Sequence, residues 1–150
     1  WEAIKADERL ARDQGQALAD VPTALPALPR AQKLQKRAAR VGFDWADSAG
    51  VFAKLDEELA ELRAAVASGE GAAISEEVGD LLFTCVNLAR QLKVDSETAL
   101  RAANAKFEAR FRTMEEAVQA EGGRLEDLDA QALDQRWVAA KAALASTKGG

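Results

Sequence analysis

The sequence contains no histidine and no tyrosine, and it has one cysteine and one methionine among 150 residues. Without histidine there is no imidazole to act as a general base or metal ligand, which excludes the Glu-x-x-His pairs of di-iron four-helix bundles. The single cysteine, Cys85, excludes an intramolecular disulfide bond, and we expect its side chain to be buried as a small apolar group. A metal site in this chain would therefore need oxygen ligands.

Long apolar runs are missing as well. No apolar segment approaches about 18 residues and no part resembles a signal peptide, so we expect a cytoplasmic protein that does not bind membranes. The net charge of −5 and the isoelectric point near 4.9 argue against a nucleic-acid partner, because nucleic-acid-binding surfaces are normally basic. The chain starts at Trp1 and not at a methionine, which suggests either an excised domain or a trimmed sequence and leaves an upstream partner domain open.

The residues that are present favour helices. Hydrophobic residues make up 48% of the chain, alanine is abundant, and there are only 3 prolines, which predicts an all-α helical bundle. Helices are expected over 30–40, 48–67, 74–92, 95–120 and 129–145, with Gly- and Pro-containing segments between them. We divide the chain into an N-terminal connector helix with a proline-containing linker (1–29), a helical domain (30–145) and a disordered tail (146–150).

Two acidic clusters fall on neighbouring predicted helices: Glu57-Glu58-Leu-Ala-Glu61 and Glu77-Val-Gly-Asp80. At about 100° per residue, Glu58 and Glu61 flank the apolar stripe of the first helix, whereas Glu57 points away from it. Glu77 and Asp80 flank the stripe of the second helix on the corresponding side. If the two helices pack antiparallel through their stripes, these four carboxylates come together. The stripes are Leu55, Leu59, Leu62 and Val66 on the first helix, and Ile74, Val78, Leu81, Cys85, Leu88 and Leu92 on the second.

Carboxylates crowded against a core suit a hard divalent cation such as Mg²⁺, with Mn²⁺ as a substitute. Like charges in such a cluster repel and raise one another's pKa unless a cation neutralises them. The alternative is that acids three residues apart simply form a solvated helix face, which is the usual case for one such cluster. Two clusters with the same geometry on adjacent helices favour the metal site.

Basic and aromatic residues on the same and later helices suggest an anionic substrate. Lys106 and Arg110 are four residues apart, as are Trp137 and Lys141, and Lys54 lies one turn before Glu58. Cations beside a carboxylate–metal centre suit a polyphosphate, and Trp137 could stack on a base. The alternative is that Lys106 and Arg110 only solvate a helix and that Trp137 belongs to the core.

The helix over 74–92 also carries a second apolar strip, Phe83 and Val86, opposite the first. A helix that is apolar on two faces is buried on two sides. In a bundle of this size, the second face predicts a dimer interface.

Taken together, these residues resemble the MazG family of nucleoside triphosphate pyrophosphohydrolases, whose hallmark is an EExxE cluster followed by ExxD. The likeness covers residues 30 to 144 and is greatest to the C-terminal, catalytic domain of bacterial MazG. Beside the acidic clusters it rests on Arg30-Ala-Gln-Lys-Leu-Gln-Lys36, Val41-Gly-Phe-Asp-Trp45, Glu76-Glu-Val-Gly-Asp-Leu-Leu-Phe83, Val86-Asn-Leu-Ala-Arg90 and Asn104-Ala-Lys-Phe-Glu-Ala-Arg-Phe111, together with Trp137 and Lys141.

The resemblance implies the all-α NTP pyrophosphatase fold, a homodimer or higher homo-oligomer, and Mg²⁺-dependent hydrolysis of NTPs and dNTPs to NMP and pyrophosphate. A role in removing non-canonical nucleotides would be in keeping with it. Carried over onto this chain, the resemblance implies the following roles. The metal ligands are Glu58, Glu61, Glu77 and Asp80, and the residues that contact the nucleotide or assist the chemistry are Lys54, Glu57, Lys106, Arg110, Trp137 and Lys141. From the chemistry of phosphoryl transfer we expect Glu57 or Glu61 to accept the proton of the attacking water.

Two other functions stay open. The first is a related all-α pyrophosphatase with one preferred substrate, such as phosphoribosyl-ATP, dUTP or dCTP. The second is a non-enzymatic helical dimerisation module whose acids form only a solvated face.

Overall fold

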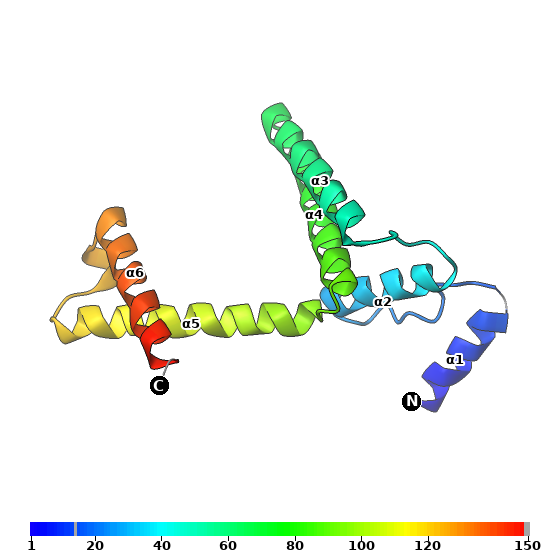
Figure 1. The fold of residues 1–150 in the computed structure, drawn as a ribbon, viewed down its shortest axis with the longest axis horizontal. Coiled ribbons are helices and arrows are strands. Elements are labelled where there is room, and N and C mark those ends of the chain that lie inside the picture. Colours follow the sequence, from blue (N-terminus) through cyan, green and yellow to red (C-terminus); the bar gives the residue numbers. More distant parts are fainter. Residues whose placement is uncertain (14, 149–150) are drawn as a thin grey trace. The chain divides into compact units, whose positions relative to one another are not determined.

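The computed structural model describes residues 1–13 and 15–148, and every regular element in these ranges is a helix. The predicted all-α fold class is therefore confirmed (Figure 1). None of the described helices combines the length and the apolar composition needed to cross a membrane. The elements are α1 (Glu2–Asp13), α2 (Ala27–Arg40), α3 (Ser48–Ser68), α4 (Gly71–Gln91), α5 (Ser96–Ala120), the short 3-10 helix η1 (Leu125–Asp127) and α6 (Ala130–Thr147).

Several helices begin or end a few residues away from the predicted limits. Helix α2 begins at Ala27 and contains Pro29 in its first turn, where the missing N–H costs nothing because the first N–H groups of a helix have no partner within it. Helix α6 continues to Thr147, so the start of the predicted disordered tail is helical. The last two residues of the predicted tail, 149 and 150, lie outside the described residues.

Contacts between residues divide the chain into two compact units, 1–97 and 98–150. The first contains α1 to α4, and the second contains nearly all of α5 together with η1 and α6. The domain limits expected from the sequence, at 29–30 and 145–146, stay predictions.

In the first unit, α3 packs along α4, and α2 also contacts α4 (Figure 1). The tight turn between α3 and α4 depends on Gly69, whose φ of 74° is left-handed and closes the end of α3 through hydrogen bonds to Ala65 and Val66. This connection of two residues sets the two long helices antiparallel, as the sequence predicted.

The buried face of α3 differs from the predicted stripe. Val51, Glu58 and Ala65, spaced seven residues apart, are the buried positions, whereas Val66 is 59% exposed. The packing face is thus rotated toward the acidic side, so that Glu58 lies within the helix interface and not on its flank. Residues seven apart lie on almost the same side of a helix, so Val51, Glu58 and Ala65 form one narrow buried row along α3.

Helix α4 is buried at Thr84 and Val86, which lie on different sides of it. Helix α2 covers part of the second apolar strip, because Gln35 donates a hydrogen bond from Nε2 to the Phe83 carbonyl oxygen over 2.9 Å. Val86 of this strip is buried within the single chain and Phe83 is 46% exposed, and the dimer interface expected at the strip stays a prediction. The expectation of a buried Cys85 was wrong, since its side chain is exposed in the single chain.

Candidate metal centre

The start of α3 is fixed by its N-terminal cap. The Asp47 side chain accepts a hydrogen bond from the Gly50 N–H over 3.2 Å, which satisfies one of the free donors of the first turn. From this cap, α3 runs along α4 with Glu58 in its buried face, where the residue is only 5% exposed. A carboxylate so placed loses most of its hydration and needs a partner.

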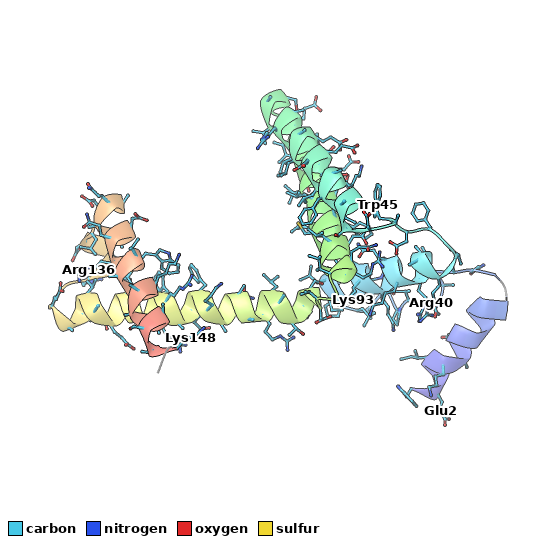
Figure 2. All side chains as sticks on the ribbon, in the orientation of Figure 1. Glu2, Arg40, Trp45, Lys93, Arg136 and Lys148 are labelled. Atoms are coloured by element: carbon cyan, nitrogen blue, oxygen red, sulfur yellow. The ribbon has the colours of Figure 1, made fainter. Side chains whose placement is uncertain are left out.

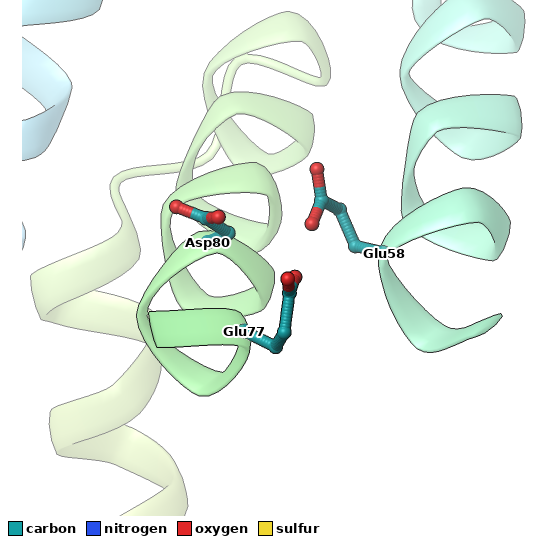
Figure 3. Close-up of side chains that lie close together, drawn as sticks. All are labelled: Glu58, Glu77 and Asp80. Carbon is teal, nitrogen blue, oxygen red and sulfur yellow. The ribbon is translucent and has the colours of Figure 1, made fainter. Parts of the chain in front are cut away.

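Helix α4 brings two more carboxylates to the same place. Glu77 and Asp80 are one turn apart, and each of Glu58, Glu77 and Asp80 offers an oxygen within 4.8 Å of those of the other two. Figure 3 shows Glu58 extending from α3 toward Glu77 and Asp80 on α4. The structure therefore brings together three of the four ligands predicted from the sequence.

Two oxygens of this cluster lie buried without any hydrogen-bond donor: Oε2 of Glu58 and Oε2 of Glu77. The nearby positive charge is Lys54, whose Nζ lies 3.1 Å from Glu58 Oε1 and 3.2 Å from Glu57 Oε1. One ammonium group cannot balance the carboxylates gathered here. Buried, unpartnered carboxylate oxygens from two helices fit a hard divalent cation, which takes oxygen ligands.

Electrostatics at Glu77 lead to the same conclusion. Burial raises the pKa of the Glu77 carboxyl above its ordinary value, and the negative charges of Glu61, Asp80 and Glu58 raise it further. Glu61, the fourth predicted ligand, is not part of the group of three, but it is among the residues that raise the pKa of Glu77. A cation at this point would remove the repulsion that these groups exert on one another.

Glu57 lies outside the group. Its side chain is 57% exposed and pairs with Lys54, in keeping with its predicted direction away from the interface. Lys54 is thus held between Glu57 and Glu58 on the surface of α3, beside the carboxylate cluster.

The other predicted substrate-binding residues belong to the second unit. Trp137 of α6 packs against Phe107 of α5, with ring centroids 5.4 Å apart, and the Arg110 guanidinium carbon lies 5.9 Å from the centre of the Trp137 ring. Lys106 and Lys141 are exposed. Within this unit, the Trp137 ring and three cations therefore lie on α5 and α6, which contact each other. The three cations are Lys106, Arg110 and Lys141.

The first unit also holds a cavity of about 640 Å³ that borders the acidic cluster. Lys54 connects the two features, because it lines the cavity and contacts Glu58. Thr84 also lines the cavity, and its Oγ1 donates to the main-chain carbonyl oxygen of Asp80, within α4, over 2.9 Å. Trp45, labelled in Figure 2, also belongs to the cavity wall. The remaining lining residues are Leu18, Leu34, Gln35, Ala38, Gly42, Phe43, Asp44, Phe83, Asn87 and Arg90.

Apart from Lys54, the polar residues of this cavity were not identified as site residues from the sequence. Gln35 and Asn87 lie within the segments that carry the family resemblance, and this was the only feature of the sequence that could have identified them as site residues. Helical periodicity could not identify them, because an amide on a helix is usually exposed to water.

Comparison with known proteins agrees with this arrangement. Residues 48–114, which span α3, α4 and most of α5, match the family model described as the MazG nucleotide pyrophosphohydrolase domain. The chain is 48% identical over 139 residues to the nucleoside triphosphate pyrophosphohydrolase of Escherichia coli (strain K12), covering 91% of this chain and 53% of that protein. It is 45% identical over 141 residues to the nucleoside triphosphate pyrophosphohydrolase/pyrophosphatase MazG of Thermotoga maritima, covering 94% of this chain and 54% of that protein. The chain thus spans about half the length of these curated relatives.

Proposed function

Because the chain belongs to the MazG family, we propose that it hydrolyses nucleoside triphosphates to nucleoside monophosphates and pyrophosphate, with Mg²⁺ held by its acidic cluster. The observation that carries the proposal is that the carboxylates of Glu58, Glu77 and Asp80 lie close together, and that one oxygen of Glu58 and one of Glu77 are buried without a hydrogen-bond donor. An uncompensated cluster of this kind destabilises a fold, so its presence is best explained by a bound cation.

In this proposal Glu58, Glu61, Glu77 and Asp80 hold the metal, with Mn²⁺ as a substitute for Mg²⁺. The ion supplies Lewis-acid chemistry and charge neutralisation to the triphosphate. Glu57 or Glu61 accepts a proton from the water that attacks phosphorus, since both lie on α3 beside the cluster. Lys54 moves its contact from Glu58 to a phosphate oxygen and stabilises the charge that develops on the leaving pyrophosphate.

Lys106, Arg110, Trp137 and Lys141 complete the proposed substrate contacts. Their support is the local cluster in which Arg110 lies against the Trp137 ring, with two exposed lysines on the same pair of helices. Such a cluster offers cations for phosphate groups and an aromatic face. The proposal also includes a homodimer or higher homo-oligomer and a cytoplasmic location.

The direct test is pyrophosphate release from a panel of NTPs and dNTPs with Mg²⁺. We expect Glu61→Gln and Asp80→Asn to lower turnover by roughly a hundredfold or more, as losses of groups that hold a catalytic metal do. Glu76→Gln is the matched control, because Glu76 is an exposed acid on the same turn of α4 and lies outside the cluster. Equal turnover in the wild type and in both cluster variants would reject the metal assignment.

The same panel decides between the proposed broad specificity and the alternatives. One nucleotide hydrolysed at least about a hundredfold faster than the rest would identify a pyrophosphatase with a single preferred substrate. Absence of any hydrolysis, together with no saturable Mg²⁺ or Mn²⁺ binding by isothermal titration, would instead identify a helical dimerisation module.

A further inference from the structure

Helix α2 is strongly basic, although the chain as a whole has a net charge of −5. Its 14 residues include no acid and five cations, which are Arg30, Lys33, Lys36, Arg37 and Arg40. The remainder of the chain therefore holds 15 of the 20 basic residues and all 25 acidic ones. This concentration of positive charge on one helix is not required by the proposed hydrolysis.

The five cations lie on one side of α2. At about 100° per residue they fall within about 120° of the helix circumference, and we call this side the basic face. Leu34, Gln35 and Ala38, which line the cavity, lie on the opposite side of the helix. The basic face is therefore separate from the cavity and from the acidic cluster that borders it.

One edge of the basic face already holds a carboxylate. Arg37 donates from Nε to both oxygens of Asp20, over 3.1 Å to Oδ1 and 2.9 Å to Oδ2, and Asp20 is only 8% exposed. Beside this pair, Arg30 donates from Nε to the Pro22 carbonyl oxygen over 3.3 Å. The anionic group that the fold itself places on this side of α2 is thus a carboxylate, held by a charge-assisted contact.

The other three cations form no ion pair with a described residue. Lys36 and Arg40, the second labelled in Figure 2, are exposed, and Lys33 is partly exposed. Like charges three or four residues apart destabilise a helix, and these residues have that spacing. The helix dipole favours Arg40 in the last turn, but Lys33 and Lys36 lie before that turn. An anion from outside the chain would remove this repulsion.

We propose that the basic face of α2 is a docking surface for an acidic helix of a partner protein. The cations at positions 30, 33, 36 and 40 recur roughly every 4.5–6 Å along the axis, at 1.5 Å per residue. Carboxylates three or four residues apart on a second helix have the same spacing, so the two rows can pair along their length. This inference goes beyond the proposed function and does not depend on it.

A nucleic acid fits the basic face less well than an acidic helix does. Nucleic-acid sites combine an extended basic surface with aromatic rings that stack on bases. Helix α2 contains no aromatic residue, and its cations span only about 15 Å. A long polyanion would also have to approach a chain whose remaining residues are predominantly acidic.

The test is fluorescence anisotropy with the full chain and labelled peptides at low salt. The first peptide is alanine-based, about 20 residues long so that it can form a helix, and carries glutamates along one side. The second has the same composition with its glutamates spread around the helix. We expect the first to bind at least about fivefold more tightly and to be released by salt. Absence of binding, or equal affinity for both peptides, would overturn the proposal.

A single-stranded oligonucleotide with the same number of negative charges is titrated in parallel. We expect it to bind more weakly than the first peptide, because the basic face offers no ring on which a base can stack. Tighter binding of the oligonucleotide would identify a nucleic-acid surface and overturn the assignment to an acidic helix.

The informative variant combines Lys33→Gln, Lys36→Gln and Arg40→Gln. Single exposed ion pairs contribute little, so all three are removed together, and we expect affinity for the first peptide to fall about tenfold or more. The control combines Arg63→Gln, Lys93→Gln and Lys148→Gln, which removes three exposed cations outside α2. It should change affinity less than about twofold. Equal losses in the two triple variants would show that only net charge matters and would overturn the proposal.

Two further measurements separate docking from folding and from hydrolysis. The α2 triple variant should melt at least as high as the wild type, because it removes like-charge pairs. A lower melting temperature would show that these cations stabilise the fold itself, against the proposal. Its pyrophosphate release from ATP should equal that of the wild type, since its residues lie outside the cavity and the acidic cluster. Peptide binding without ATP hydrolysis in the wild type would reject the proposed function and leave the docking surface standing, whereas hydrolysis without peptide binding would do the reverse.

Discussion

At the scale of single residues, the acidic cluster places function in conflict with stability. Glu58 occupies a position in the α3 packing face that an apolar residue would fill at lower cost, and Glu77 faces it from α4. Burial and neighbouring charges raise the pKa of Glu77, which means that its ionised form is disfavoured where it stands. Sites of this kind are commonly retained for their activity at the expense of the stability of the fold.

This conflict predicts the behaviour of Glu77→Gln. Removing one of the crowded charges should raise the melting temperature of the protein in EDTA, because the remaining carboxylates repel each other less. The same substitution should reduce the Mg²⁺-induced rise in melting temperature from about 5 °C or more in the wild type to about 1 °C or less, since ligands stabilise only the state that binds them. Thermal unfolding followed by circular dichroism, with EDTA and with Mg²⁺, measures both effects.

Glu76→Gln serves as the control for this pair of measurements, because it removes one negative charge from an exposed position on the same helix. It should leave the Mg²⁺ effect unchanged. A Glu77→Gln variant that is less stable in EDTA and still gains the full Mg²⁺ effect would contradict the description of the cluster.

The acidic residues could be predicted from the sequence because helical spacing alone places acids three residues apart on one side of a helix. Glu58, Glu77 and Asp80 were found in this way. Gln35 and Asn87 could not be found, because nothing in their local sequence distinguishes a buried amide from a solvated one. Their environment is created by residues from α2, α4 and the segment over 41–47, and it exists only after these have packed.

At the scale of the elements, helix lengths were predicted well and helix faces less well. The limits of α3 and α5 lie within a residue or two of those expected, since Asp47 and Ser96 mark their starts and glycines follow their ends. The buried face of α3 was misjudged because Leu55, Leu59, Leu62 and Val66 form the more apolar stripe. Which face is buried depends on the neighbouring helices as well as on hydrophobicity, and a part of the apolar stripe remains exposed in the single chain.

The C-terminal end of α4 gives a prediction about stability. Lys93, labelled in Figure 2, has a φ of 62°, the left-handed conformation that usually belongs to glycine at this position after a helix. Lys93→Gly should raise the free energy of unfolding by about 0.5–1 kcal/mol, because glycine adopts this conformation without a steric cost. Urea unfolding should show a higher midpoint with an unchanged slope. Lys93→Ala retains the steric cost, so an equal gain in both variants would contradict this explanation.

The segment between α2 and α3 gives a prediction about pH. Asp44 accepts hydrogen bonds from both terminal nitrogens of Arg90, one of them over 3.2 Å, and Arg90 holds the pKa of the Asp44 carboxyl below its usual value. The stabilisation is therefore complete above the pKa of the unfolded chain and is lost as the pH falls through the lower pKa of the folded state. Asp44→Asn should lower the free energy of unfolding by about 1–2 kcal/mol at pH 7.

This difference between the wild type and Asp44→Asn should shrink as the pH falls below about 4, where the carboxyl of the unfolded chain takes up a proton, and it should be lost once the pH has fallen through the lower pKa of the folded state. Urea unfolding at a series of pH values measures it. A difference that stays constant down to the acid limit would show that the Asp44 charge is not the stabilising group.

At the scale of the whole molecule, the single chain leaves many large apolar side chains exposed. On α4, Val78 is 40% and Leu82 55% exposed, and Cys85, one turn further on, is exposed too. These three residues lie on one face of the helix, because they are spaced by four and three positions. Exposed apolar rows of this kind indicate a protein–protein interface. The face differs from the Phe83 and Val86 strip that the sequence suggested, yet it favours the same conclusion, a homo-oligomer.

Leu82→Asp is the variant that tests this conclusion, since Leu82 does not line the cavity and does not belong to the acidic cluster. If the Val78–Leu82–Cys85 face pairs with a second copy, light scattering during gel filtration should give a dimer or larger assembly for the wild type. A buried aspartate without a partner should disfavour association by several kcal/mol, so the variant should shift toward the monomer. The Cys85 thiol, which the single chain exposes, should react slowly with a thiol reagent in the wild type and rapidly in Leu82→Asp. An oligomer that survives the substitution with Cys85 freely reactive would place the interface on another face, because a thiol covered by a second chain cannot be reached by the reagent.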